Sequence, residues 1–149
     1  MTDKLFIALL NAYSAHSKKS RNAFQSIGLS TGQPKVLYIL RRNEGKLQKE
    51  IANLCSVEQS TMTVLVKNMV ARNWVRREPV KVSSGKHAYH LYLTETGNEI
   101  ARKIEDIVEL LEEKALIDFS ESEKQALLEM LNRVESNLLS PELTHNERR

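Results

Sequence analysis

The sequence predicts a mainly α-helical fold that carries one small β-hairpin. Two amphipathic segments between residues 46 and 73 are separated by a short turn. Directly after them, residues 74–78 and 89–93 are rich in β-branched and aromatic side chains, and the turn signal Ser83-Ser84-Gly85 lies between them. A helix-turn-helix followed by a β-hairpin is a winged helix, an arrangement that holds one helix in the major groove of DNA.

The helices of this core follow from apolar spacing and from capping signals. Residues 3–24 carry apolar side chains at steps of three and four. Ser30 and Gln33 fit a capping box, which predicts that the second helix begins at Ser30. The third helix is expected at residues 48–54 with Leu54 buried, and the fourth at residues 59–73. The fourth helix is the expected recognition helix.

Two longer helices are predicted after the hairpin. Thr94 and Ser120 are their expected caps, and Pro141 ends the second one. Their apolar stripes need a partner surface, since such helices are not stable alone in water. We expect a second copy of the chain to supply it, with an intramolecular bundle as the alternative. The expected organisation is one domain over 1–149, with a winged-helix core at 30–94, dimerisation helices at 1–28 and 95–140, and a disordered tail at 141–149.

Charge is divided unevenly along the chain, although the formal net charge is only +3. Residues 30–93 carry eleven Lys and Arg against four acids, whereas residues 94–149 carry seven against fourteen. Phosphate neutralisation needs such a concentrated basic region, so its coincidence with the winged-helix pattern favours DNA over a merely solvated surface. No apolar run approaches the roughly 18 residues that span a bilayer. One cysteine and no convincing signal peptide predict a cytoplasmic protein.

An ordered set of residues resembles the MarR (multiple antibiotic resistance regulator) family of winged-helix transcription factors. The matching positions run from Gly28-Leu29-Ser30 and Gln33, through Glu50-Ile51-Ala52, Ser60-Thr61 and Thr63, to Trp74-Val75 with Arg77 and Leu93-Thr94 with Gly97. The family's wing usually carries an Asp-x-Arg pair, where this chain has Gly85 and His87. The resemblance implies a ligand-responsive regulator, more often a repressor, that binds a pseudo-palindromic operator as a homodimer.

Candidate DNA contacts come from the fourth helix and from the hairpin. The side chains expected to read bases are Gln59, Ser60, Thr61 and Thr63. This set contains no Arg for guanine, which indicates an A·T-rich site. The candidates for contacts with the DNA backbone or through the wing are Lys67, Arg72, Arg76, Arg77, Lys81, Lys86 and His87. Surface charge or helix capping alone is the alternative for each, and Arg77 has an internal salt bridge as a further alternative.

The resemblance also implies a small effector, typically aromatic and anionic, bound between the dimerisation helices and the winged helix. Helix facing alone suggests Tyr13, His16, Tyr38 and Arg42 as the pocket, with core or interface packing as the alternative. The effector would shift the population between two spacings of the recognition helices.

Other classes of function have weaker support. The chain lacks the Gly-rich phosphate loop, His-Glu-x-x-His and Gly-x-Ser-x-Gly motifs, so no enzyme is predicted. No histidine pairs with another ligand at metal-binding spacing, and no cofactor is expected. Cys55 has no flanking charge and is interpreted as structural rather than redox-active. The principal alternative is a winged-helix adaptor that binds proteins without reading DNA, and metal or oxidant sensing is a third possibility.

Overall fold

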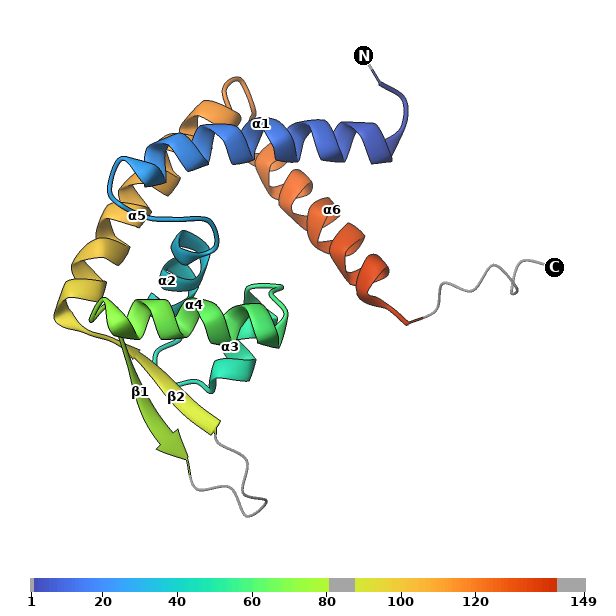
Figure 1. The fold of residues 1–149 in the computed structure, drawn as a ribbon. Coiled ribbons are helices and arrows are strands. Elements are labelled where there is room, and N and C mark those ends of the chain that lie inside the picture. The colour runs from blue at the N-terminus through green and yellow to red at the C-terminus, as the bar shows by residue number, and fades with distance from the viewer. Residues whose placement is uncertain (1, 81–87, 142–149) are drawn as a thin grey trace. The chain divides into compact units, whose positions relative to one another are not determined.

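The computed structural model describes residues 2–80 and 88–141, and the chain packs as two units, Met1–Glu112 and Glu113–Arg149. The first unit contains α1 (Leu5–Gln25), α2 (Gln33–Arg41), α3 (Gln48–Leu54) and α4 (Gln59–Ala71), followed by the strands β1 (Val75–Val80) and β2 (Ala88–Leu93) (Figure 1). Helix α5 (Glu95–Ala115) begins in the first unit, and α6 (Glu121–Leu139) belongs to the second. The described elements confirm the predicted helical fold with a two-stranded wing.

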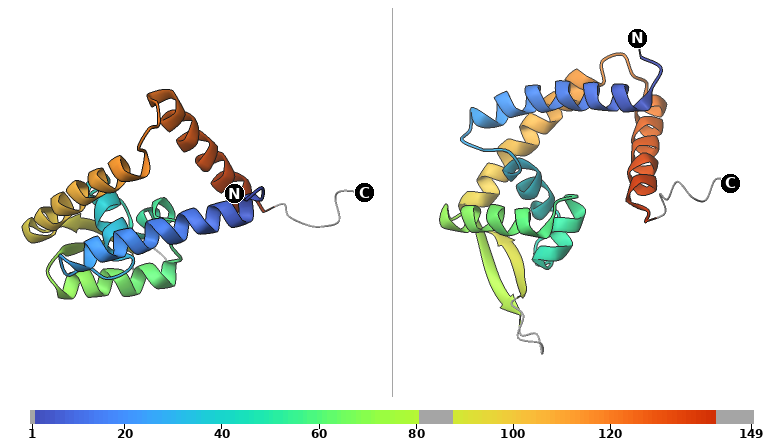
Figure 2. Two further views of the ribbon diagram at one scale, coloured as in Figure 1. Left: turned by 90° about the horizontal axis from the view of Figure 1, so that it is seen from above. Right: turned by 45° about the vertical axis from the view of Figure 1, so that its right-hand side comes forward.

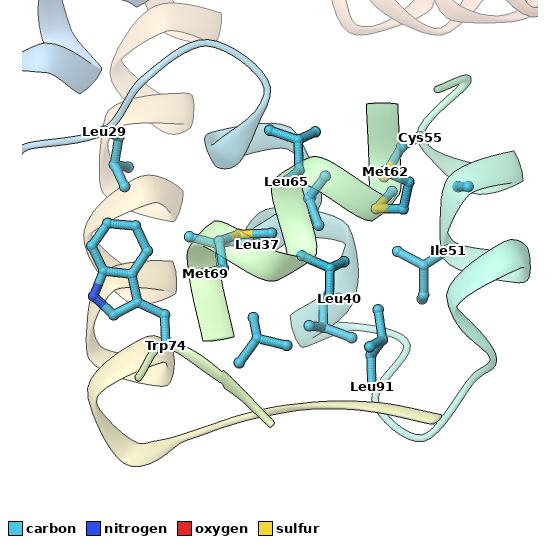
Figure 3. Close-up of a cluster of buried hydrophobic side chains, with 14 of the residues drawn as sticks. Leu29, Leu37, Leu40, Ile51, Cys55, Met62, Leu65, Met69, Trp74 and Leu91 are labelled. Atoms are coloured by element: carbon cyan, nitrogen blue, oxygen red, sulfur yellow. The ribbon is translucent and has the colours of Figure 1, made fainter. Parts of the chain in front are cut away.

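One hydrophobic core holds the helix-turn-helix and the wing together. Side chains of α2, α3, α4 and β2 point toward one another in Figure 3, among them the fully buried Leu37, Ile51, Met62 and Leu91. The four fully or almost fully buried positions of α4 are Met62, Leu65, Val66 and Met69. Their steps of three and four residues are those of one helix face. This burial fixes which side of α4 remains available to a partner.

The wing is a two-stranded antiparallel hairpin that is attached to the helix-turn-helix. Its register runs from Val75 opposite Leu93 to Val80 opposite Ala88. Strand β2 also bonds to the segment before α3: the Leu91 N–H donates to Lys46 O over 3.1 Å, and the Gly45 N–H donates to Leu91 O over 2.8 Å. These bonds tie the base of the wing to the entry of the helix-turn-helix. The predicted turn Ser83-Ser84-Gly85 lies outside the described residues.

The predicted cap of α5 is confirmed, and it fixes this helix to the end of α4. Thr94 Oγ1 accepts a hydrogen bond from the Gly97 N–H over 3.0 Å and donates one to Asn73 O over 2.6 Å. Gly97 itself packs against backbone, because a Cβ atom at this position would lie 1.9 Å from the carbonyl oxygen of Trp74. Only glycine permits that approach. The other predicted cap is also confirmed: Ser120 Oγ accepts from the Glu123 N–H over 3.1 Å.

Three local predictions need correction. Helix α2 begins at Gln33 rather than Ser30, because Gly32 adopts φ 92° and is the N-terminal flanking residue. Half of the predicted capping box remains, since the Ser30 N–H donates to Gln33 Oε1 over 2.9 Å. Leu54 is exposed at 48%, and the neighbouring Cys55 takes the buried position. Strand β1 extends to Val80, beyond the predicted end at residue 78, and includes Pro79 opposite Tyr89.

Candidate nucleic-acid interface and a neighbouring cavity

The exposed side of α4 carries all four residues that were predicted to read bases. Gln59, Ser60, Thr61 and Thr63 are exposed and occupy the first two turns of the helix. In the left view of Figure 2, α4 lies at the edge of the first unit. None of its thirteen residues is acidic. The helix therefore presents an uncharged polar surface at its start, followed by the cation Lys67, without carboxylates that would repel phosphate.

Thr63 is held more firmly than the sequence suggested. Its hydroxyl donates to Gln59 O over 2.9 Å, so the proton is already used and the oxygen is left as an acceptor. Gln48 at the start of α3 brings its amide nitrogen to 3.5 Å from the hydroxyl oxygen of Thr63. Sequence reasoning did not include Gln48 among the candidate contacts. No spacing rule connects it to Thr63, and only the packing of α3 beside α4 brings the two side chains together.

The turn before α4 is kept in place by backbone bonds and by a buried thiol. The Val57 N–H donates to Ala52 O over 3.0 Å, and Ser56 adopts φ 51°. Cys55 is fully buried, and burial raises the pKa of its thiol, an effect that nearby Lys35 partly offsets. A raised pKa keeps the sulfur protonated and a poor nucleophile. This environment supports the structural interpretation of Cys55.

Guanidinium groups at the end of α4 and along the wing stack on aromatic rings. Arg72 lies over Trp74, Arg76 over Tyr92 and Arg77 over Tyr89, at 5.0, 4.5 and 4.8 Å from the ring centroids. Stacking restricts a long side chain while leaving its N–H groups free to donate.

An ion pair was considered for Arg77, but among the described residues it is Arg76 that forms one on this strand, with the carboxylate of Glu78. Because the pair partly neutralises Arg76, the charge that this strand presents to solvent is reduced. The remaining wing candidates Lys81, Lys86 and His87 lie outside the described residues.

A cavity of about 550 Å³ lies beside α1, α2 and α5 within the first unit. Of the four residues predicted to line a pocket, Tyr13, His16 and Tyr38 lie at its wall. Other lining residues are Ser17, Ser20, Arg21, Phe24, Leu29, Ser30, Thr31, Gly32, Pro34, Lys35, Ile104 and Val108. None of the described lining residues is acidic, whereas Arg21 and Lys35 are cationic, so the wall suits an anionic guest with an apolar body.

Arg42 is not part of the cavity wall. Its guanidinium lies 4.1 Å from the centroid of the Tyr38 ring and 3.0 Å from a carboxylate oxygen of Glu105. The other oxygen of Glu105 accepts from Arg41 over 2.7 Å. Glu105 on α5 therefore joins two arginines at the end of α2. Arg42 of this cluster stacks on Tyr38, which is a residue of the cavity wall.

The fold, the exposed helix α4 and the wing define a DNA-binding transcriptional regulator of the winged-helix class. The sequence profile of the MarR family matches residues 27–82. The chain is 34% identical over 113 residues to the uncharacterized HTH-type transcriptional regulator YwoH of Bacillus subtilis (strain 168), covering 74% of this chain and 78% of YwoH. The chain belongs to the MarR family, whose members are transcriptional regulators rather than enzymes.

Solved structures share this fold over nearly the whole chain. The transcriptional regulator SlyA matches with a TM-score of 0.76 and 27% identity over 92% of this chain and 94% of SlyA. A MarR family regulator from Listeria monocytogenes complexed with 26mer DNA matches with a TM-score of 0.77 and 23% identity over 93% and 90%. Bordetella bronchiseptica BpsR, whose DNA binding is regulated by 6-hydroxynicotinic acid, matches with a TM-score of 0.78 and 16% identity over 89% and 94%.

Proposed function

We propose that the protein is a cytoplasmic homodimeric repressor that reads a pseudo-palindromic operator with two copies of α4 and releases it when a small anionic aromatic ligand binds. In this account Gln59, Ser60, Thr61 and Thr63 contact bases. Contacts with the DNA backbone or through the wing come from Lys67, Arg72, Arg76, Arg77, Lys81, Lys86 and His87. The observation that carries the ligand response is the acid-free cavity between α1, α5 and α2.

Exposed apolar surface supports the homodimer. Helix α1 has 21 residues and none is buried, and Leu5, Phe6 and Tyr13 are exposed at 59, 70 and 67%. Helix α6 has 19 residues and likewise none is buried, with Leu138 and Leu139 exposed at 62 and 71%. Monomeric proteins rarely leave such surface uncovered. A second copy that covers both helices brings two recognition helices into one particle, which is what a pseudo-palindromic operator requires.

The position of the cavity supports coupling between ligand and DNA binding. Its wall combines residues of α1 and α5 with Tyr38 of α2, which packs in the winged-helix core. A ligand that fits one spacing of these helices better than another shifts the population toward that spacing. Changing the separation of two recognition helices by a few Å prevents simultaneous docking of both half-sites, and the gain from bivalency is lost.

The ligand response is tested with 6-hydroxynicotinate as the probe and its neutral amide as the comparison. Anisotropy titration of an operator duplex follows release of the protein, and calorimetry follows ligand binding. Arg21→Ala should weaken binding of the carboxylate, because the Arg21 side chain lines the cavity. Lys19→Ala removes a charge from the same helix outside the cavity wall and should not. Equal loss in both variants, or equal binding of carboxylate and amide, would contradict an anion site in this cavity.

A protein-contact adaptor remains the second candidate, because Gly85 and His87 replace the residues that usually form the wing tip in this family. That function predicts binding to a protein partner that is insensitive to salt and indifferent to DNA.

A further inference from the structure

One apolar side chain on the exposed side of α4 has no role in the core. Val64 is 59% exposed, although the other large aliphatic residues of this helix are buried or half-buried. The four core residues of α4 lie on the opposite side, and Val64 follows Ser60 by one turn and precedes Lys67 by another. Val64 therefore lies in the middle of the surface that the proposed function places in the major groove.

The fold gives no reason for valine at this position. A β-branched residue lowers helix propensity, and an exposed site on a helix is better occupied by Ala, Lys or Glu. Exposed valine also leaves apolar surface in water without a partner in the described part of the chain. A local choice that contradicts propensity without any packing gain is expected at a functional position.

The chemistry of a base edge supplies a partner. In the major groove the apolar group presented by a base pair is the C5 methyl of thymine, and aliphatic side chains contact it directly. The surroundings of Val64 favour this partner. Ser60 offers a hydrogen-bonding group one turn earlier, Lys67 offers a cation for phosphate one turn later, and α4 contains no arginine or acid.

We propose that Val64 selects thymine at one position of each operator half-site by covering its C5 methyl group. This rests on the proposed docking of α4 in the major groove and adds a specificity determinant to it. Val64 was not among the residues singled out from the sequence, because a valine in a helix normally indicates the core. Its exposure in the folded chain is what identifies it.

The test uses the full-length protein and an operator obtained by selection from random duplexes. Each thymine of one half-site is replaced in turn by deoxyuridine, which removes the methyl and leaves base pairing unchanged. Wild-type affinity should fall about fourfold at one thymine, the value expected for exposing one methyl-sized apolar group. In Val64→Ala the same replacement should change affinity less than about 1.5-fold, the limit set by a much smaller apolar contact. Alanine at an exposed helical site does not endanger folding.

Two further variants complete the test. Val64→Ile keeps an aliphatic contact and should retain the methyl dependence. Lys67→Ala should weaken binding to both duplexes and leave their affinity ratio unchanged.

The inference would be overturned if the wild-type protein bound its operator specifically but its affinity did not change at any thymine-to-deoxyuridine replacement. The proposed function would then remain in place. Persistence of the methyl dependence in Val64→Ala would likewise overturn the inference. Selection that yields no preferred duplex would overturn both the Val64 inference and the proposed function.

Discussion

At the scale of single residues, Gly97 shows how closely α5 is joined to the winged helix. Gly97→Ala would place a Cβ 1.9 Å from the Trp74 carbonyl oxygen, and the three nearest atoms all belong to the Trp74 backbone, so no flexible side chain can yield. We expect the free energy of unfolding to fall by about 3 kcal/mol or more. Urea unfolding followed by circular dichroism measures it.

Gly28→Ala is the matched control for Gly97→Ala. Gly28 adopts φ +82°, and apart from its two chain neighbours no described residue would lie within 4 Å of a Cβ at this position. The cost there is backbone strain alone, about 1–2 kcal/mol. If both variants lost the same stability, the close approach of Gly97 to Trp74 would not be the determining contact.

Glu78 reduces the positive charge that β1 presents to solvent. Its carboxylate pairs with Arg76, whose guanidinium also stacks on Tyr92. In Glu78→Gln the guanidinium stays in place and loses its counter-charge. We expect operator affinity to rise about twofold to fivefold, the range expected for one exposed ion pair. The slope of log affinity against log salt should steepen by about one.

Anisotropy titrations at several salt concentrations measure both quantities for Glu78→Gln. The double variant with Arg76→Gln should return to the wild-type slope or below. An unchanged slope in Glu78→Gln would show that Arg76 does not approach phosphate.

At the scale of the element, the proposed roles on α4 separate sequence reading from phosphate contact. Thr63→Ala removes an acceptor at the base-facing start of the helix and should relax sequence preference. Lys67→Ala should weaken binding to every duplex alike and lower the salt slope by about one. Competition between operator and random duplexes measures the two effects. If Thr63→Ala and Lys67→Ala each lost similar affinity for the operator and for the random duplex, these roles would be contradicted.

Helices α2 and α5 are joined by the two ion pairs of Glu105, with Arg41 and Arg42. The three side chains are between 26% and 51% exposed, so solvent screens each pair. Glu105→Gln should cost about 1 kcal/mol of unfolding free energy, and less at high salt. Thermal unfolding at two salt concentrations measures it. Glu109→Gln, which removes an exposed acid from the same helix, should have no comparable effect.

The features of these elements that the sequence predicts correctly are those that depend on local pattern, namely apolar spacing and capping residues. Apolar spacing over residues 59–73 predicted α4, and its buried face is Met62, Leu65, Val66 and Met69. The capping roles of Thr94 and Ser120 followed from their residue types. The start of α2 was missed because Gly32 turns the chain where it packs against Leu65, a tertiary contact. Arg21, Lys35 and Gln48 were missed for the same reason, since folding alone brings them to the cavity and to Thr63.

At the scale of the whole molecule, exposed apolar surface on α1 predicts self-association. Phe6 and Leu10 on this helix are 70 and 47% exposed. The double variant Phe6→Glu with Leu10→Glu places two negative charges on this surface. We expect the variant to retain its helical circular dichroism and to sediment as a monomer, because buried unpaired charge opposes pairing. Leu54→Glu, which changes an exposed leucine of α3, should remain dimeric. A wild-type protein that sediments as a monomer at micromolar concentration would contradict the homodimer.

The measurement that tests the central claim most directly is the affinity of the full-length protein for its own upstream region against a scrambled duplex of equal composition. Anisotropy titrations at about 50 and about 200 mM salt cover the range in which phosphate contacts dominate the salt response. We predict binding to the upstream region that is tighter by about 10³ or more and falls steeply with salt. Equal, weak affinity for both duplexes would contradict a specific regulator of its own region, and absence of binding at low salt would favour the adaptor.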